Sequence, residues 1–203
     1  MDMKTWLGET EHAMRAAISL IWAEHAAVAD ATDELAKLEE ATERGYRQSK
    51  AFMDNFDDEG LATAIHWDTY FGVDKERYHA AEALDALKGT QEARSASRAV
   101  LAGAALQIAK QGISAVHGKL DASPDGRKDA VVALKELIWQ GRNQAMHWEE
   151  GKPHKAVETC FETLRASNPV FADYTVRNLA FEVVELLGWK DYAAFEADML
   201  SLA

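Results

Sequence analysis

Apolar residues recur every three or four positions along most of the chain, the spacing of one face of an α-helix. Between about residues 10 and 53, an apolar stripe that includes Ile18 and Trp22 predicts one long helix. Thr10 is the candidate N-cap of this helix, and the segment 30–33 is a candidate break. No stretch has the alternation of a half-buried strand, and all three prolines follow residue 120. The pattern therefore predicts an all-α fold.

The next part of the chain predicts helices separated by acidic and glycine-containing segments. The acidic stretch 54–60 is expected to end the first helix, and Gly72 to divide the two elements that follow. Asp74 is the candidate cap of the second of these elements. Thr90 is then expected to cap a further helix that ends near Gly118.

The helix predicted from Thr90 is the most apolar in the sequence, and Gly103 and Gly112 would let another helix approach it closely. We expect this helix at the centre of a helical bundle. A turn at residues 123–126 and a helical periodic run over 130–138 follow it.

The last part of the chain predicts three closing helices. Gly151 suits the left-handed residue that ends a helix, and Pro153 suits a first helical turn. The closing helices are expected at residues 154–166, 169–187 and 190–202.

Composition narrows the class of protein. We find no repeat, low-complexity linker or shift in composition, so we expect one domain over residues 1–203. The chain lacks a secretion signal and an apolar run of spanning length, which predicts a cytoplasmic protein without membrane contact. Cys160 is the only cysteine and is expected to be a buried thiol. The scattered histidines and the missing nucleotide and zinc motifs predict no metal and no cofactor.

The charge is unevenly distributed. The net charge is −12, which by itself disfavours a polyanionic partner because nucleic-acid affinity depends on cationic contacts. Residues 1–90 contain 9 Lys and Arg against 19 Asp and Glu, whereas residues 91–160 contain 10 against 8. The middle of the chain can therefore face a polyanion and the first part cannot.

One segment has the residue types of a catalytic motif. Arg142, Asn143 and His147 stand within six residues of one another after the amphipathic run that ends at Ile138. An Arg, a polar residue, three variable residues and a His resemble the signature of the HEPN superfamily of helical bundles. The resemblance covers about half of the chain, with a HEPN-like core at about residues 60–166.

The resemblance implies a metal-independent endoribonuclease. His147 would act as acid and base on the 2′-hydroxyl, Arg142 would stabilise charge on the phosphate, and Asn143 would orient one or both. Histidine suits proton transfer near neutral pH, and the arginine fork matches phosphate oxygens. The product would be a 2′,3′-cyclic phosphate. The family also implies a homodimer in which the motifs of two chains meet. It further implies a role as a toxin or antiphage effector. An inhibitory protein is a candidate partner for such an effector.

Helix geometry limits how this motif can work. Positions five apart on a helix point about 140° from each other, so Arg142 and His147 cannot both reach one phosphate from a straight helix. Asn143 and His147, four apart, share a face. Either the helix unwinds near Gly141 or a second copy completes the site.

Three residues after the motif are weaker candidates for substrate binding. Lys152, His154 and Lys155 offset Glu149 and Glu150, whose charge would repel a phosphate chain. Surface lysines after a turn are also commonly solvated without a ligand.

Alternatives to a nuclease remain at this stage. Arg142 and Asn143 would brace the bundle, with His147 at a helix end, in a catalytically silent interaction module whose acidic first half binds a basic protein partner. A small-molecule binder with a site in the bundle core is the third candidate. Trp139 and Trp148 are either base-stacking residues or structural anchors.

Overall fold

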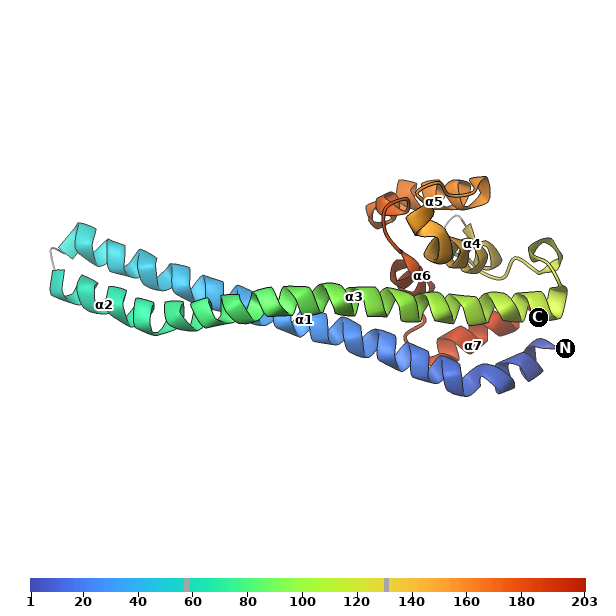
Figure 1. The fold of residues 1–203 in the computed structure, drawn as a ribbon, viewed down its shortest axis with the longest axis horizontal. Coiled ribbons are helices and arrows are strands. Elements are labelled where there is room, and N and C mark those ends of the chain that lie inside the picture. The colour runs from blue at the N-terminus through green and yellow to red at the C-terminus, as the bar shows by residue number, and fades with distance from the viewer. Residues whose placement is uncertain (57–58, 130–131) are drawn as a thin grey trace. The chain divides into compact units, whose positions relative to one another are not determined.

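The computed structural model describes residues 1–56, 59–129 and 132–203, apart from the side chains of 128, 129 and many residues between 28 and 91. The described chain is predominantly helical, which confirms the all-α prediction. Its α-helices are α1 (Met3–Phe56), α2 (Glu59–Phe71), α3 (Val73–His117), α4 (Leu134–His147), α5 (Lys155–Ser167), α6 (Ala180–Leu187) and α7 (Tyr192–Ser201), shown in Figure 1. The 3₁₀ helices are η1 (Leu120–Ala122), η2 (Trp148–Glu150) and η3 (Pro169–Asp173).

The only extended pairing in the described residues is short. Strand β1 (Lys128–Asp129) pairs antiparallel with β2 (Val132–Ala133), with Lys128 opposite Ala133 and Asp129 opposite Val132.

Internal contacts divide the chain into two compact units. Unit 1 comprises Met1–Glu24 and Ser95–Ala203, and unit 2 comprises His25–Arg94. Helices α1 and α3 contribute residues to both. The expectation of one domain over 1–203 stays a prediction, because this division does not show whether either unit folds alone.

The core of unit 1 is built around the α3 segment from Ala102 to Ile113. Helices α4, α5 and α6 lie on one side of this segment, and α7 and the start of α1 lie on the other (Figure 1). Small residues allow this close packing, since a Cβ on Gly112 would lie 2.7 Å from the Trp6 ring. The predicted central position of this segment and the close approach at Gly112 are thus confirmed.

Large apolar side chains fill the same core. Trp189, Phe161, Phe171 and Phe195 are almost completely buried, and burial of one such side chain stabilises the fold by about 1.5–3 kcal/mol. The core extends from α1 to α7, so the end of the chain closes the bundle.

Polar contacts fix α7 in place. The carboxylate of Asp198, only 6% exposed, accepts from Arg127 Nε at 2.6 Å and from Trp189 Nε1 at 2.8 Å. His117 Nε2 lies 2.6 Å from the carbonyl oxygen of Leu202. The buried Asp198 carboxylate and the half-buried His117 ring therefore each have a partner.

Unit 2 contains α2 and the adjoining parts of α1 and α3. The Tyr46 ring of α1 lies 5.5 Å from the His66 ring of α2, measured between centroids. Gly72 separates α2 from α3, as predicted, and its N–H donates to the Asp68 carbonyl at 2.8 Å. The acidic stretch ends α1 at Phe56 as predicted, and residues 57–58 lie outside the described part.

Several predicted helix boundaries in the first part of the chain are wrong. Helix α1 starts at Met3, because Asp2 Oδ1 accepts from the Thr5 N–H at 2.8 Å and caps the helix ahead of Thr10. The helix also continues without a break through 30–33. Helix α3 starts at Val73, so Asp74 is in its first turn and Thr90 is inside the helix. Local capping signals were outweighed by continuous helical neighbours.

Boundaries later in the chain also differ from prediction. The run expected over 130–138 is displaced, since α4 begins at Leu134, and residues 130–131 lie outside the described part. The helix expected over 169–187 is instead η3, a turn and α6. Asn168 starts η3 by accepting from the Val170 N–H, and Pro169 takes the first position of that short helix.

The segment Glu92–His117 is long and apolar enough to cross a membrane, by composition and length only. A core helix of a water-soluble protein passes the same test, and this segment contains the central helix of unit 1. The absence of membrane contact and the cytoplasmic location stay predictions.

Candidate functional site

Helix α4 positions the predicted motif. Leu134, Leu137 and Ile138 bury its apolar face, and Gly141 lets α6 approach so closely that a Cβ there would lie 2.9 Å from Val183 Cγ1. The helix runs without interruption to His147, so it does not unwind at Gly141. An unwound helix near Gly141 therefore cannot bring Arg142 and His147 to one phosphate. A second copy of the chain is the alternative that is left.

The chain turns sharply after the motif. Helix η2 follows α4 directly and ends at Gly151, whose φ of 65° is the left-handed conformation predicted for this glycine. Pro153 precedes the N-cap His154 of α5, so it stands just before the first helical turn and not within it. This turn brings residues after Gly151 back beside the end of α4.

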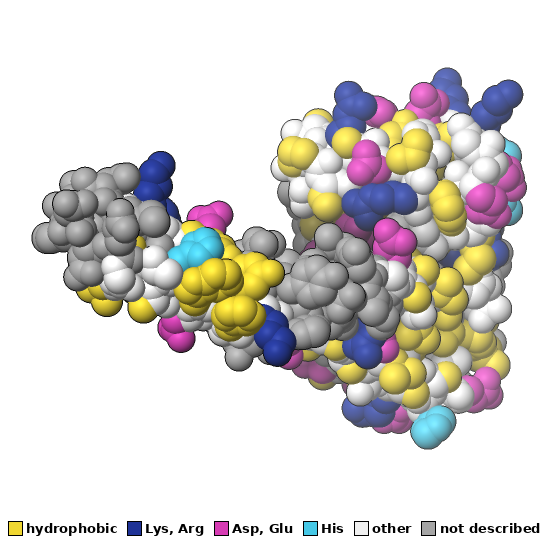
Figure 2. Space-filling view, turned by 60° about the vertical axis from the view of Figure 1, so that its left-hand side comes forward, with side chains coloured by type: hydrophobic (Ala, Val, Ile, Leu, Met, Phe, Trp, Pro, Cys, Tyr) yellow, Lys and Arg dark blue, Asp and Glu magenta, His cyan; other side chains and the backbone are white. Residues whose placement is uncertain are grey.

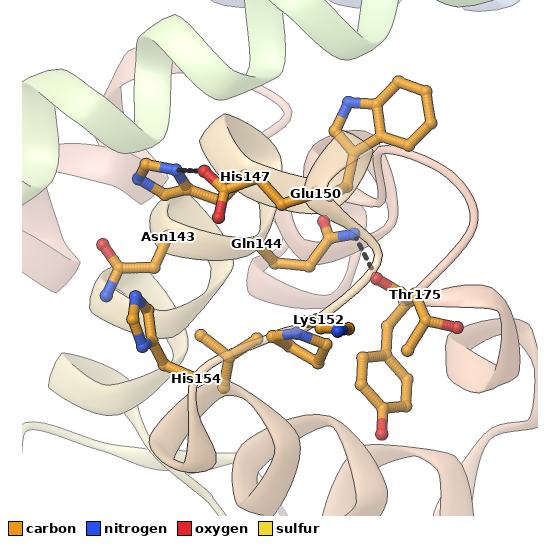
Figure 3. Close-up of a pocket in the computed structure, with 11 residues that line it drawn as sticks. Asn143, Gln144, His147, Glu150, Lys152, His154 and Thr175 are labelled. Carbon is orange, nitrogen blue, oxygen red and sulfur yellow. Dashed lines mark hydrogen bonds and ion pairs between the residues drawn. The ribbon is translucent and has the colours of Figure 1, made fainter.

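A shallow polar pocket lies at this turn (Figure 3). Its volume of about 10 Å³ is roughly the space of one water, so a larger ligand would lie across it. The walls come from the end of α4, η2, the start of α5 and the segment after η3. They comprise Asn143, Gln144, His147, Trp148, Glu150, Lys152, Pro153, His154, Val157, Tyr174 and Thr175.

His147 is held by a carboxylate at the rim of this pocket. Its Nδ1 lies 2.8 Å from Glu150 Oε1, and the side chains are 46% and 56% exposed. An ionised carboxylate only accepts, so Nδ1 carries the hydrogen of this bond and Nε2 of the neutral ring has a free lone pair. The arrangement suits His147 to accept a proton at Nε2.

Arg142 does not line the pocket. Its Nε donates to Gln107 Oε1 of α3 at 2.5 Å, and its Nη1 donates to Asn143 Oδ1 at 3.2 Å. Asn143 Nδ2 in turn donates to Gln140 Oε1 at 3.3 Å. The half-buried Arg142 therefore connects the pocket residue Asn143 to α3, and it points away from His147, as positions five apart on a helix do.

Gln144 fixes the pocket wall that Tyr174 and Thr175 form. It is 2% exposed, and its Nε2 donates to the carbonyl oxygens of Tyr174 at 2.8 Å and Arg177 at 2.7 Å. Its Oε1 accepts from the Leu179 N–H at 2.9 Å. One side chain thus satisfies three backbone groups of the segment that places Tyr174 and Thr175 at the pocket.

The weaker sequence candidates separate in space. Lys152 and His154 line the pocket together with Asn143 and His147. Lys155 lines a different hollow, beside Glu136 and Cys160. The structure therefore brings two of these three candidates to the motif.

The two tryptophans beside the motif also differ. Trp139 is half-buried against the core, with Lys110 Nζ 4.4 Å from its ring centroid. Trp148 is 36% exposed, and it lines both the pocket and a neighbouring groove of about 310 Å³ beside Arg98 and Phe181.

Sequence reasoning missed Glu150 and Gln144 as site residues. The sequence alone indicates Glu150 only as a repulsive charge, although its place three residues after His147 allows the contact that the structure shows. Gln144 shares its helix with the motif, but its partners are some thirty positions later, and no local signal indicates them.

Fold and site together define a class: an all-α protein with a shallow surface pocket that contains two histidines, a lysine and an asparagine. Comparison with protein-family models, with curated proteins and with solved structures gives no match to this chain. Within the described residues, no group of three or more His, Cys, Asp or Glu side chains could hold a metal ion.

Cys160 should react slowly with thiol reagents in the folded protein. Burial, with a smaller effect of Glu136, raises the pKa of its thiol to about 12, so little thiolate exists at pH 8. We expect reaction with Ellman's reagent to be at least about 10²-fold slower than in denaturant, and to accelerate as the pH rises toward that pKa. Equal rates in the folded and denatured protein at pH 8 would contradict this assignment.

Proposed function

We propose that this protein is a metal-independent endoribonuclease of the HEPN type. The observation that supports this proposal most directly is the meeting of Asn143 and His147 at one pocket, with the imidazole oriented by Glu150. A histidine oriented by a carboxylate is an arrangement that proton-transfer catalysis uses.

The proposed reaction is attack of an RNA 2′-hydroxyl on the adjacent phosphate. Nε2 of His147 accepts the hydroxyl proton, and Asn143 orients the phosphate through its amide. Arg142 keeps Asn143 in place through their hydrogen bond, in addition to any direct contact with phosphate. The shallow pocket requires the strand to lie over it, which favours an exposed single-stranded segment as substrate.

A homodimer is part of the proposal. Arg142 lies outside the pocket of its own chain, so a direct contact of its guanidinium with the phosphate would come from a second copy. Mixing Arg142→Ala and His147→Ala proteins should then restore part of the cleavage rate. If the mixture does not cleave RNA although subunit exchange is confirmed, this cross-subunit contact is excluded. A toxin or antiphage role, with an inhibitory protein as partner, belongs to the same proposal.

RNA cleavage in EDTA tests the activity directly. Purified protein should convert RNA to fragments that end in 2′,3′-cyclic phosphates while EDTA is present, because no step needs a metal. Mass spectrometry of the fragment ends is the measurement, and the His147→Ala protein prepared in parallel controls for contaminating nucleases. Intact RNA, or equal cleavage by both proteins, would refute the proposal.

A second candidate function is a catalytically silent interaction module, which a surface of unit 2 favours. Trp67, Tyr70 and Phe71 of α2 are 48%, 48% and 63% exposed. Figure 2 shows apolar side chains gathered beside a histidine on this unit. Large exposed aromatic clusters are typical of protein contact sites. Under this alternative, wild-type protein leaves RNA intact, and Trp67→Ser with Phe71→Ser abolishes co-purification of a protein partner.

A further inference from the structure

We infer that His154 is the general acid of this site and that Lys152 is its phosphate-stabilising cation, so that one chain supplies a complete pair of proton-transfer groups. This inference rests on the proposed RNA cleavage. It assigns definite catalytic roles to two residues for which the sequence suggested only substrate contact.

The first support is position. His147 comes from the end of α4 and His154 from the N-cap of α5, and both line the same small pocket. In Figure 3 the Asn143 amide lies between the two imidazole rings, and one ring nitrogen of His154 is directed toward it. Because the Asn143 amide lies between the two rings, a phosphate held at Asn143 would face both of them (Figure 3).

The second support is a difference between the two histidines. Nδ1 of His147 is engaged by Glu150, which leaves Nε2 as an acceptor. Within the described residues, no hydrogen bond engages either ring nitrogen of His154, so either nitrogen can face a substrate. A transphosphorylation needs one group that accepts a proton and a second group that donates one.

The transphosphorylation needs no proton-transfer group other than His147 and His154. The 2′-oxygen forms a bond to phosphorus as its proton passes to Nε2 of His147. The bond between phosphorus and the 5′-oxygen breaks, and that oxygen receives a proton from His154. The products are a 2′,3′-cyclic phosphate and a 5′-hydroxyl, with no change in oxidation state.

Lys152 provides a permanent positive charge at this pocket. It lines the pocket, whereas Arg142 is turned toward Gln107 of α3. Charge grows on the non-bridging phosphate oxygens as the 2′-oxygen attacks, and an ammonium group beside them stabilises that state. Lys152 comes from the Gln144 and Thr175 side of the pocket (Figure 3), and its flexible side chain would carry the ammonium to the phosphate of any substrate, regardless of the leaving group.

Two substrates with different leaving groups test the role of His154. The dinucleotide UpA releases a 5′-alkoxide that needs a proton, whereas uridine 3′-(4-nitrophenyl phosphate) releases a stable anion that does not. We expect His154→Ala to lower UpA cleavage by about 10²-fold or more and to change nitrophenyl release by only a few-fold. His147→Ala should lower both rates, and the exposed His12→Ala should lower neither.

Lys152 has a separate signature. Lys152→Ala should lower both rates by similar factors, and Lys152→Arg should restore most of each rate, because the charge and not the leaving group matters. An unequal loss, or no rescue by arginine, would overturn the role given to Lys152.

Failure of the inference differs from failure of the proposed function. Suppose that wild-type protein cleaves UpA in EDTA. If His154→Ala then cleaves UpA as fast as wild type, or if its rates on both substrates fall by equal factors, His154 is not the general acid. If wild-type protein cleaves neither substrate, the nuclease proposal falls and the inference falls with it. Thermal melting of each variant shows that the protein remains folded.

Discussion

His147→Ala should reduce RNA cleavage by about 10²–10⁴-fold while the melting temperature stays within about 2 °C of wild type. Removal of a positioned proton-transfer group produces a loss of this size. The side chain is 46% exposed and its bond to Glu150 is at the surface, so its removal costs the fold little. Initial rates in EDTA and circular dichroism melting curves measure the two effects.

Glu150→Gln is the matched control for this variant. The glutamine can still accept from Nδ1 but has no charge, so we expect a smaller loss, of about tenfold, from weaker support of the imidazolium. A melting temperature that falls by several degrees in His147→Ala, with cleavage preserved, would instead show that His147 braces the helix end.

The helical character of the chain was predictable because it depends on the spacing of apolar residues that are close together in the sequence. Ile18 and Ile21 of α1 and Leu134, Leu137 and Ile138 of α4 follow the helical period and are buried as that period requires. Helix boundaries were less predictable, because a capping residue such as Thr10 or Thr90 is effective only where the neighbouring residues leave the helix. Asp2 caps α1 instead, because its Oδ1 accepts from the Thr5 N–H in the first helical turn.

The candidate site was predictable in the same local sense. Helix geometry alone placed Asn143 and His147 on one face and Arg142 on another, and the structure has this arrangement. The partners across the fold were not predictable, because the contact of Arg142 with Gln107 joins residues 35 positions apart. Only the packing of α4 against α3 determines which side chain meets Arg142.

Gln144→Met should lower the free energy of unfolding by about 3 kcal/mol, a larger effect on stability than we expect for a substitution at Asn143 or His147. Methionine matches the length of glutamine, so the core stays filled. It cannot replace the bonds to the carbonyls of Tyr174 and Arg177 or the bond from the Leu179 N–H. Those backbone groups would be buried without partners, each at a cost of about 1–3 kcal/mol where no water reaches it.

The neighbouring Asn143→Ala provides the comparison, since Asn143 is half-buried and its bonds to Arg142 and Gln140 measure 3.2 and 3.3 Å. We expect Asn143→Ala to cost less than about 1 kcal/mol, and Gln144→Met to lower the melting temperature by about 6–12 °C at this chain length. Because Gln144 also places Tyr174 and Thr175 at the pocket, RNA cleavage should fall in Gln144→Met even below its melting range. Equal melting temperatures for the two variants would mean that Gln144 does not hold this segment, and that the pocket wall depends on the packing of Phe171 and Tyr174 against Phe161 instead.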